Sequence, residues 1–485
     1  MSRFLLIPWL TTAVSLIGAG SDWPRFRGVD GSGVAVNTRA LPDEIAPGKN
    51  EVWRVELLPG HSSPVLWGDH IYLTAAELGK PSDAGRDKIV DEGGKLFTYC
   101  LRRKDGKLLW RKEAPRPRLE RYQRTNSPAS PSPAADRDGV YVFFGDYGVI
   151  AYKHDGTERW RHPLGPFNNV NGHGSSPMLA GGRVIMLCDQ DSNSYLIALD
   201  RRSGETAWKV ERPEVVRSYV TPTLWRDQII IPGSYNLTAY AATTGEKLWW
   251  IGGLSWQPKS TPIVDGDTIY AHWWEAGGEA ETPTETPEFG EMLAKFDANQ
   301  DGKISRQEVA ADARQTRGFA DTDLAGDGFI ERHDWDNVRA RRASRNALLA
   351  VRPGAARGDL TTSKAIQWRI QKFLPNVPSP LLYDGVLYLV KDGGILSTVN
   401  PGTGEIHKQG RLTGALDTYY SSPVGGAGKV LLLSQTGKAT LVKAGAQWEI
   451  LSSADFDEPI FATPAIADDR LYLRTRSRLY CFGLK

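Results

Sequence analysis

The sequence predicts an all-β fold: an eight-bladed β-propeller of four-stranded antiparallel blades, with a small α-helical insertion in the fifth blade. A Ser/Thr-Pro dipeptide with an apolar or tyrosine residue eight positions after its proline recurs eight times. Most of these dipeptides lie about 43 residues apart, a period that propellers and solenoids show. The prolines are Pro64, Pro133, Pro177, Pro222, Pro262, Pro380, Pro423 and Pro464, and their partners are Tyr72, Tyr141, Ile185, Ile230, Tyr270, Tyr388, Leu431 and Tyr472.

Each repeat divides into four short strands. In the unit that begins at Thr221, the pattern predicts strands at 221–225, 228–232, 237–241 and 247–250. Turns rich in Gly and Asp separate the strands, as in antiparallel hairpins. Many short strands with periodic glycine and aromatic residues are typical of propeller blades. The 16 tryptophans and 50 glycines of the chain agree with this interpretation.

A tryptophan follows a glycine by four positions in four of the repeats. Glycine permits the positive φ of a tight hairpin, and we expect the tryptophan ring to cover the edge between neighbouring blades. Lys408 takes the tryptophan position in one later repeat, so that blade is expected to be held less firmly. The pairs are Gly106 and Trp110, Gly156 and Trp160, Gly204 and Trp208, and Gly245 and Trp249.

The ends of the chain are expected to meet. After Pro464 only three strands fit, at 463–467, 471–474 and 478–482. An open array would leave an unpaired strand edge, which natural proteins avoid. We therefore predict that residues 51–55 supply the fourth strand of the last blade.

Composition limits the classes of partner. The chain has 485 residues, with 59 Lys and Arg against 57 Asp and Glu. The net charge of +2 gives no sign of a nucleic-acid partner or of an anionic membrane surface. Cys100, Cys188 and Cys481 lie far apart in strand-like segments, which favours buried free thiols over a disulfide framework.

Residues 1–20 have the pattern of a signal peptide. Arg3 is followed by a mostly apolar stretch at 4–17 and by the small residues of 18–20. An uncleaved anchor is the alternative, although the apolar stretch is short for a membrane span. The predicted location is therefore periplasmic or secreted, in a bacterium, with no transmembrane segment after signal removal. Residues 21–50 then form an N-terminal extension.

The long interval between Pro262 and Pro380 interrupts the fifth blade. The later strands of that blade are predicted at 272–275, 347–351 and 366–370. Residues 279–345 form the insertion, which begins with an acidic linker rich in Thr and Pro at 279–288. The propeller accordingly comprises residues 51–278 and 346–485.

Residues 297–308 have the pattern of an EF-hand Ca²⁺ loop. Ca²⁺ prefers about seven oxygen ligands. Gly302 allows the sharp bend at position 6, Ile304 at position 8 is expected to pair with a partner loop, and residues 289–296 form the preceding helix. An Asp-, Asn- and Gly-rich surface turn is the alternative. The predicted ligands are Asp297, Asn299, Asp301, Lys303 through its carbonyl oxygen, Ser305 and Glu308.

A second loop of this kind begins at Asp323. Ala325 stands where position 3 needs a ligand, and Asp334 at position 12 is shorter than glutamate, so we expect weaker Ca²⁺ binding or a Mg²⁺-compatible site. The alternative is a structural loop that pairs Ile330 with Ile304. The candidate ligands are Asp323, Asp327, Phe329, Glu331 and Asp334. Arginines within 339–345 are expected to form a solvated helix face.

The loops before the Ser/Thr-Pro dipeptides form a candidate ligand or partner site. Propellers bind ligands at the mouths of their channel, and chain direction places these loops on one face. The ordinary polarity of loops is the alternative explanation for their composition. The candidate residues are His61, Asn126, Asn171, His173, Arg217, Tyr219, Gln257, Lys259, Asn376, Tyr419 and Tyr420.

The unit from Ala198 to Trp208, Ala-Leu-Asp-x-x-Ser-Gly-Glu-x-x-Trp, resembles the repeat of the pyrroloquinoline-quinone-like (PQQ-like) β-propellers. That family includes quinoprotein alcohol dehydrogenases and BamB-like assembly factors, both eight-bladed. Residues 22–33 look like the mature N-terminus of exported BamB-like proteins. The enzymes of the family stack PQQ on a disulfide between adjacent cysteines, and this chain has no Cys-Cys, so the resemblance argues against a PQQ cofactor here.

These observations predict an exported, non-catalytic scaffold for binding or assembly, with Ca²⁺ held by the EF-hand insertion. No nucleophile–His–acid arrangement, zinc spacing or phosphate loop is evident in the sequence. The expected partner is another envelope protein, a secreted protein or a glycan at the aromatic mouth. The alternative is a PQQ-dependent oxidoreductase that acts on alcohols or sugars.

Overall fold

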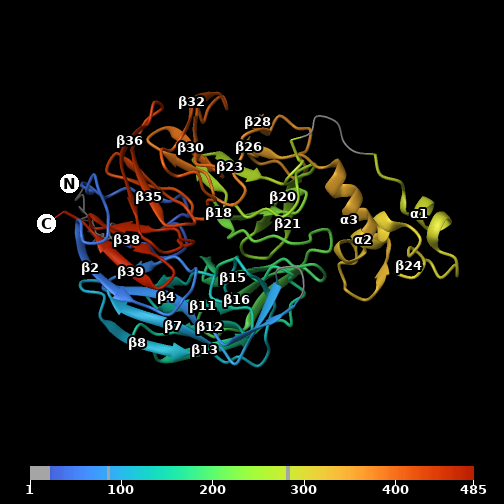
Figure 1. Ribbon diagram of the computed structural model, residues 1–485, viewed down its shortest axis with the longest axis horizontal. Helices are drawn as coiled ribbons and strands as arrows, with labels where there is room; N and C mark the ends of the chain where they lie inside the picture. The colour runs from blue at the N-terminus through green and yellow to red at the C-terminus, as the bar shows by residue number, and fades with distance from the viewer. Residues whose placement is uncertain (1–21, 85–87, 280–284, 485) are drawn as a thin grey trace, which may run out of the picture.

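The structure, a computed structural model, describes residues 22–84, 88–279 and 285–484. The predicted signal peptide and part of the predicted linker, residues 280–284, lie outside the described residues. Within these ranges, eight sheets of four or five strands follow one another around a common centre (Figure 1). We number them sheets 1 to 8, in the order of the eight dipeptides. Their strands run antiparallel, apart from two short parallel additions.

Sheets 1 to 4 come first in the chain. Sheet 1 has β3 (Val65–Trp67), β4 (His70–Glu77), β7 (Lys95–Arg102) and β8 (Leu108–Glu113). Sheet 2 has β10 (Ala134–Asp136), β11 (Gly139–Phe144), β12 (Gly148–Tyr152) and β13 (Glu158–Pro163). Sheet 3 has β14 (Met178–Ala180), β15 (Arg183–Cys188), β16 (Tyr195–Asp200) and β17 (Thr206–Glu211). Sheet 4 has β18 (Thr223–Trp225), β19 (Gln228–Gly233), β20 (Asn236–Ala241), β21 (Lys247–Ile251) and the added β27 (Gly358–Asp359).

Sheets 5 to 8 come next in the chain and occupy the remaining positions around the common centre. Sheet 5 has β22 (Ile263–Asp265), β23 (Thr268–Trp273), β26 (Ala347–Val351) and β28 (Ile366–Ile370). Sheet 6 has β29 (Leu381–Tyr383), β30 (Val386–Lys391), β31 (Ile395–Val399) and β32 (Ile406–Arg411). Sheet 7 has β33 (Val424–Gly426), β34 (Lys429–Leu433), β35 (Lys438–Lys443), β36 (Glu449–Asp455) and the added β1 (Val34–Ala35). Sheet 8 has β37 (Ala465–Ala467), β38 (Arg470–Arg474), β39 (Arg478–Phe482) and β2 (Glu51–Glu56).

The eight-residue offset in the sequence has a direct structural cause. The residue after each proline pairs with the residue eight positions after that proline, as Val65 does with Tyr72 and Ala465 with Tyr472. The same pairing occurs in the six other sheets. The offset is therefore the length of one tight antiparallel hairpin at the inner edge of each sheet.

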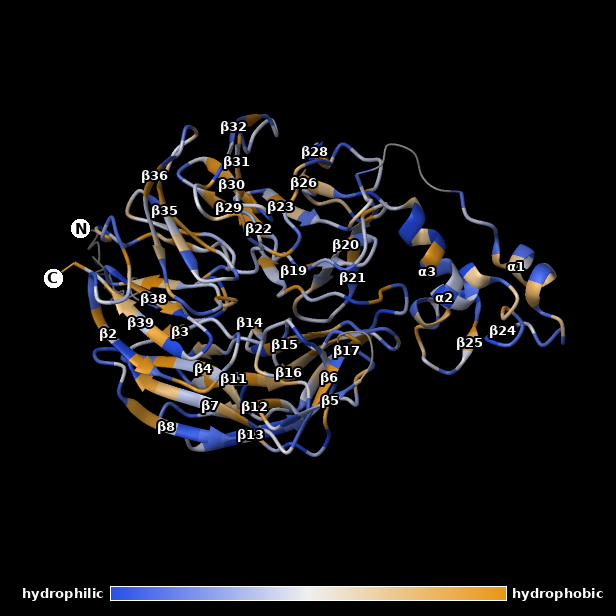
Figure 2. Ribbon diagram, in the orientation of Figure 1, coloured by the Kyte–Doolittle hydropathy of each residue, from blue (hydrophilic) through white to orange (hydrophobic). Residues whose placement is uncertain are grey.

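The chain closes through its N-terminal strand, as predicted. Strand β2 pairs with β39, with Trp53 opposite Cys481. One apolar cluster also contains side chains from sheets 7, 8 and 1, including Leu431, Leu473 and Leu73. Hydrophobic residues concentrate in the inner and middle strands, whereas the outer strand β13 is largely hydrophilic (Figure 2). The last sheet is therefore packed against the first as well as paired with the N-terminal strand.

The tryptophans cover the junctions between sheets, as predicted. The ring of Trp110 lies 2.9 Å from the position that a Cβ on Gly156 would take, and Gly156 has φ of +84°. The indole nitrogen of Trp110 donates to the carbonyl oxygen of His154 at 2.8 Å. Trp53 covers Gly106 in the same way. A tryptophan of one sheet therefore packs on the glycine turn of the next.

Lys408, which replaces a tryptophan, also reaches the next sheet. Its ammonium group donates to the carbonyl oxygen of Trp448 at 2.6 Å and lies 4.3 Å from the centre of that ring. The junction therefore has a cation–π contact and a hydrogen bond in place of an indole.

The N-terminal extension enters the ring. Residues 22–35, which we call the plug, run from sheet 1 to sheet 7. Trp23 forms a β-bridge with Leu66, and β1 adds to β33 in parallel. The backbone N–H of Ala135 donates to the carbonyl oxygen of Pro24 at 2.7 Å.

Two buried arginines hold the plug in place. Arg25 donates to the carbonyl oxygen of Pro222 at 3.1 Å, and Arg27 donates to that of Pro380 at 2.6 Å. Both carbonyls belong to the recurring dipeptides, in sheets 4 and 6. The innermost strand of each sheet starts just after its proline. The plug therefore lies on the strand side of the dipeptides, which is the side opposite to the loops that precede them.

Two smaller units extend from the ring. One is a three-stranded sheet of β5 (Lys80–Asp83), β6 (Lys88–Glu92) and β9 (Tyr122–Gln123), in which β5 and β6 come from the segment between β4 and β7 of sheet 1 and β9 follows β8. The insertion contains α1 (Phe289–Phe296), α2 (Ala313–Thr322) and α3 (Arg332–Ala343), with β24 (Ile304–Ser305) paired to β25 (Phe329–Ile330), and it protrudes to one side (Figure 1). None of the helices in the described ranges combines the length and hydrophobicity that a bilayer crossing requires.

The insertion has a core of its own and several contacts with the ring. Phe289, Phe319 and Trp335 belong to the core. Leu324 instead packs against Trp256 of the ring. The hydroxyl of Tyr235 bonds the side chain of Asn337 in α3 at 2.5 Å. The insertion is therefore anchored to the turn between β19 and β20 of sheet 4 and to the loop that precedes sheet 5.

Candidate functional site

The Ser and Thr residues of the eight dipeptides form a ring of hydroxyl groups. In seven of the eight repeats, the backbone N–H of this residue donates to the hydroxyl oxygen of its counterpart in the next repeat, over 2.9–3.1 Å. The exception is the link from Thr221 to Thr261, where the buried Thr261 Oγ1 has no partner. The members of this hydroxyl ring are Ser63, Ser132, Ser176, Thr221, Thr261, Ser379, Ser422 and Thr463.

A second ring of residues lies next to the hydroxyl ring, on the side of the loop face. Extended backbone alternates its side chains, so the residue two positions before each hydroxyl faces the same way. All eight of these residues line one central cavity. This mouth ring consists of His61, Ser130, Gly174, Tyr219, Lys259, Val377, Tyr420 and Phe461.

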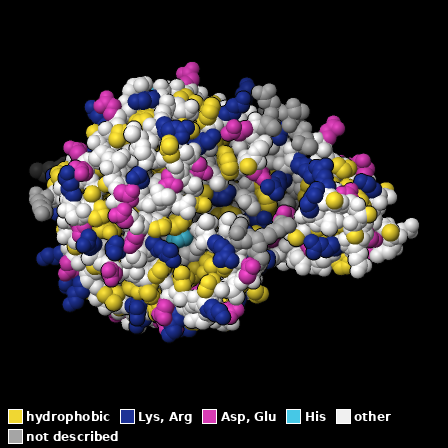
Figure 3. Space-filling model, in the orientation of Figure 1, with side chains coloured by type: hydrophobic (Ala, Val, Ile, Leu, Met, Phe, Trp, Pro, Cys, Tyr) yellow, Lys and Arg dark blue, Asp and Glu magenta, His cyan; other side chains and the backbone are white. Residues whose placement is uncertain are grey.

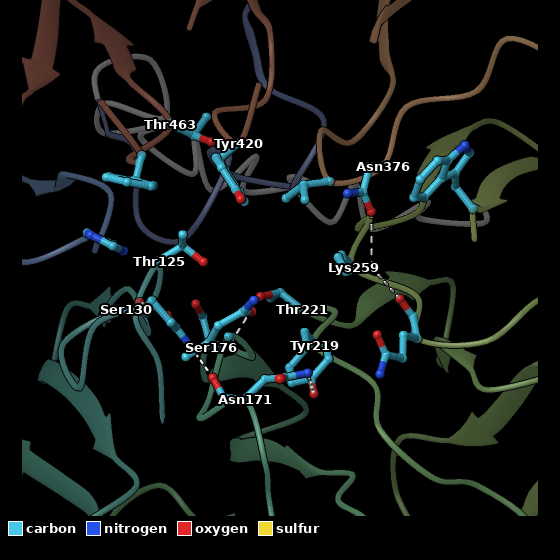
Figure 4. A pocket seen from close by; sticks show the side chains of 18 of the residues that line it. Thr125, Ser130, Asn171, Ser176, Tyr219, Thr221, Lys259, Asn376, Tyr420 and Thr463 are labelled. Atoms are coloured by element: carbon cyan, nitrogen blue, oxygen red, sulfur yellow. Dashed lines mark hydrogen bonds between the residues drawn. The ribbon is translucent and has the colours of Figure 1, made fainter. Parts of the chain in front are cut away.

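The cavity has a volume of about 460 Å³, within the range of roughly 300–1,000 Å³ that small-molecule sites occupy. Lys259 and Asn376 lie on one side of it, with Asn171 and Tyr219 below and Tyr420 above (Figure 4). Phe26 of the plug also lines the cavity. Because the plug lies on the strand side of the dipeptides, Phe26 forms the floor and the loop face forms the opening.

The insertion contributes to the wall of the same cavity. Arg341 of α3 forms an ion pair with Glu275, and its guanidinium carbon lies 4.0 Å from the centre of the Trp256 ring. These three residues and Trp274 line the cavity. The space-filling view shows the insertion as a lobe beside the ring (Figure 3).

Lys259 is the cation of the mouth ring. Its Nζ donates to the carbonyl oxygen of Gln257 at 3.1 Å and to Oδ1 of Asn376 at 3.2 Å (Figure 4). Burial lowers the pKa of Lys259 to about 8, an effect that Glu275 and Asp392 partly oppose. Both hydrogen-bond acceptors of this ammonium group, a backbone carbonyl and a side-chain amide, are neutral.

His61 is an aromatic member of the mouth ring. Its imidazole stacks on Phe461, with ring centres 4.0 Å apart. Burial, together with the positive charges of Arg474 and Arg476, lowers the pKa of His61 to about 3. The imidazole is therefore neutral at pH 7.

The structure brings most of the predicted mouth residues together. His61, Asn126, Asn171, Tyr219, Gln257, Lys259, Asn376 and Tyr420 line the cavity. Three others lie behind its wall. His173 packs edge-on against Phe143 and Phe167, Arg217 pairs with Asp191, and the hydroxyl of Tyr419 donates to the carbonyl oxygen of Ala415.

Sequence reasoning missed several lining residues. Ser130, Val377 and Phe461 stand three positions before a proline, as His61 and Lys259 do, so the repeat register could have identified them. Phe26 and Arg341 carry no such signal, because the plug and the insertion lie outside the repeat.

The first loop of the insertion turns its acidic side chains inward. Asp297 accepts hydrogen bonds from the backbone N–H groups of Asp301 and Gly302, at 3.1 and 3.0 Å. Glu308 accepts from those of Ala298 and Ser305, at 3.0 and 2.7 Å. Gly302 has φ of +81°, as the bend requires. The first and last carboxylates of the loop are thus both bonded to its backbone.

The second loop has the same frame. Asp323 accepts from Gly328 N–H at 2.9 Å, and Asp334 accepts from Leu324 N–H at 3.0 Å. Ile304 pairs with Ile330 between the two loops, as predicted. Across the part of the chain that the structure describes, no group of three or more His, Cys, Asp and Glu side chains is arranged around a metal position.

None of the three cysteines lines the cavity. Cys100, Cys188 and Cys481 are free and buried in β7, β15 and β39, as predicted. Burial raises the pKa of each thiol to about 12. They therefore act as small apolar residues of the sheet cores.

Comparison with known sequences supports a BamB-like repeat. The family model described as "Outer membrane protein assembly factor BamB" matches residues 98–272. A curated protein of that name from Alkalilimnicola ehrlichii is 24% identical over 216 residues, which is 44% of this chain. The match spans about half of that relative, 49% of its length.

Comparison with solved structures supports the propeller fold. BamB from Moraxella catarrhalis superposes with a TM-score of 0.53 at 13% identity, over 90% of this chain and 97% of that one. A europium-containing methanol dehydrogenase gives 0.57 at 9% identity, over 96% and 98%. The quinohemoprotein alcohol dehydrogenase of Comamonas testosteroni gives 0.55 at 12% identity, over 96% and 81%. The solved structures therefore support a β-propeller fold, and residues 98–272 are similar to the repeats of the BamB family model.

Proposed function

We propose that this protein is an exported, BamB-like scaffold for binding or assembly, in which sheets 1 to 8 are the eight blades of one closed ring. The observation that carries the proposal is the position of Arg341. A helix of the insertion supplies a wall to the cavity at the open mouth, while the plug fills the other side. Mouth, cavity and insertion then form one binding surface. Residues 1–20 support a periplasmic or extracellular location.

Ca²⁺ binding by residues 297–308 is part of this proposal. The loop offers hard oxygen donors at the spacing that Ca²⁺ needs, and the inward carboxylates of Asp297 and Glu308 support the fit. In Asp323–Asp334, Ala325 leaves one ligand position without an oxygen, so this loop is the weaker site. Bound Ca²⁺ would stabilise the insertion, because metal binding and folding are coupled.

Calorimetry of the full chain with Ca²⁺ tests the metal site. We expect saturable heat in the wild type and a loss of at least one site in Glu308→Gln, since one oxygen of the bidentate ligand loses its charge. Asp336→Asn, which neutralises an exposed carboxylate of α3, is the matched control. Identical heats for the wild type and Glu308→Gln would refute the assignment.

Site-directed photo-crosslinking in the native cell envelope tests the scaffold role. A crosslinker at Gln257, in the mouth, should give a discrete adduct with one envelope or secreted protein, or with a glycan. A crosslinker at the exposed Leu109 of outer strand β8 is the control. Equal adduct patterns at both positions would contradict a partner surface at the mouth.

The dehydrogenase neighbours favour PQQ-dependent oxidation of alcohols or sugars as the second candidate. The residues present fit this cofactor poorly. The stacking disulfide that the resemblance implies has no counterpart, because Cys100, Cys188 and Cys481 lie in separate strands and do not line the cavity. Dye-linked oxidation by the purified protein, with PQQ and Ca²⁺ added, would promote this candidate.

A further inference from the structure

We propose that the central cavity binds a small acidic sugar of the uronic acid class, with its carboxylate on Lys259 and its ring among the aromatic side chains of the mouth. The inference rests on the proposed function and names the ligand class of the same surface.

The net charge of the side chains that line the cavity favours a ligand with one negative charge. Three charged side chains line the cavity: Lys259, Arg341 and Glu275. The lining therefore has two positive charges and one negative charge, a net charge of +1. Because Arg341 and Glu275 neutralise each other in an ion pair, this net charge lies on Lys259. No described carboxylate forms an ion pair with Lys259, whose acceptors are the neutral oxygens of Gln257 and Asn376. A partly buried ammonium without a paired anion is costly, and one bound carboxylate compensates it.

The wall matches a polyhydroxylated ring. Of the twenty-five lining residues, twelve are Ser, Thr, Asn or Gln and six are Phe, Tyr or Trp. A purely apolar acid would leave many of the hydroxyl and amide groups without partners. A phosphate dianion carries more charge than one lysine balances. A sugar acid offers hydroxyls for the polar groups, an apolar C–H face for the rings and a single charge.

Access is from one direction. Phe26 and the hydroxyl ring close the cavity below, and the mouth ring opens above. The volume of about 460 Å³ accommodates a monosaccharide or the terminal unit of a longer chain. A long polysaccharide therefore cannot pass through the channel. Of such a chain, only the uronic acid unit at the end can enter the cavity.

Protonation of Lys259 gives an independent readout. The charged groups around it are Glu275, Asp392 and Arg341, and the imidazole of His272 also lies near. The pKa of Lys259 is lowered to about 8. A bound carboxylate favours the ammonium form and raises this pKa. Binding at pH 8 therefore takes up protons, whereas binding at pH 6 does not.

The first test needs only the wild-type protein. Tryptophan fluorescence and calorimetry are recorded with D-glucuronate and D-galacturonate and with the methyl esters of both. We expect binding of at least one acid, and affinity weaker by about tenfold or more for its ester, because the ester removes one charge-assisted hydrogen bond. Equal affinity for acid and ester, or binding of neither acid, overturns the proposal.

The second test locates the site. Lys259→Met should weaken acid binding by about tenfold or more and abolish the proton uptake at pH 8, measured in buffers of different ionisation enthalpy. Lys104→Met, at an exposed turn, should change neither. Unchanged binding by a folded Lys259→Met protein overturns the assignment. Ca²⁺ titration and crosslinking test the insertion and the scaffold separately, so either proposal can fail alone.

Discussion

The backbone N–H of Thr463 donates to the hydroxyl oxygen of Ser63 at 3.0 Å, across 400 positions of sequence. This bond joins the last repeat to the first at the inner edge of the ring. At the outer edge, β2 completes the last sheet by pairing with β39. The ring is therefore closed twice, once by a hydroxyl group and once by a strand.

Loss of the Ser63 hydroxyl should destabilise the fold. Ser63→Ala leaves the buried N–H of Thr463 without an acceptor, which costs about 1–3 kcal/mol in the free energy of unfolding. Guanidinium denaturation measures this change. Thr243→Ala, at an exposed turn position, is the control and should stay within about 0.5 kcal/mol of the wild type. Equal losses in both variants would contradict a structural role for the hydroxyl ring.

Gly156 should tolerate alanine less well than Gly253. Both residues have positive φ, +84° and +74°, so both substitutions strain the backbone. Only at Gly156 would the new Cβ meet a ring, that of Trp110 at 2.9 Å, whereas nothing lies within 4 Å at Gly253. Displacing the ring should make Gly156→Ala costlier by about 1–3 kcal/mol. Thermal unfolding compares the two, and equal melting temperatures would disprove the tryptophan contact.

The second loop of the insertion should gain Ca²⁺ affinity from one substitution. Ala325→Asp supplies the oxygen that position 3 lacks. Calorimetry should then show tighter binding at this loop, by about tenfold, which corresponds to roughly 1.4 kcal/mol. Ala311→Asp adds the same charge at an exposed position outside both loops and serves as the control. Affinity raised equally by both variants would indicate a general charge effect.

Stability should fall as the pH decreases from about 6.5 to about 4, partly because of His272. Burial lowers the folded-state pKa of His272 from 6.5 to about 4. In this range the unfolded chain binds a proton that the folded chain excludes, so the free energy of unfolding decreases with falling pH. The slope is up to about 1.4 kcal/mol per pH unit for each such histidine. His61 and His173, both with pKa lowered to about 3, act in the same direction.

His272→Gln isolates this contribution. The Nε2 of His272 bonds the carbonyl oxygen of Pro375 at 3.1 Å, and the amide of glutamine can donate to the same carbonyl without titrating. Urea denaturation between pH 4 and 7 should show a shallower slope than in the wild type. The exposed His407→Gln is the control. A slope unchanged in His272→Gln would disprove the assignment.

The repeat and its hairpins could be predicted from the sequence because they depend on local geometry. The offset from Pro64 to Tyr72 reports one hairpin, and the strand boundaries of β26 and β28 matched the predicted 347–351 and 366–370. Chain direction also placed the loops that carry His61 and Lys259 on the face of the mouth, where both residues line the cavity. His173 and Arg217 were predicted at the mouth by the same loops but lie behind the wall, because they are outside the repeat register.

The sequence by itself determined the strand order, the pairing of the closing strand and the two loops of the insertion, since each follows from residues at a short or regular spacing. Only the tertiary structure decided that the plug carries Phe26 to the floor of the cavity and that α3 brings Arg341 to its wall. The physical reason is that both contacts join segments with no common period. Their positions depend on where buried side chains such as Arg27 and Leu324 find partners.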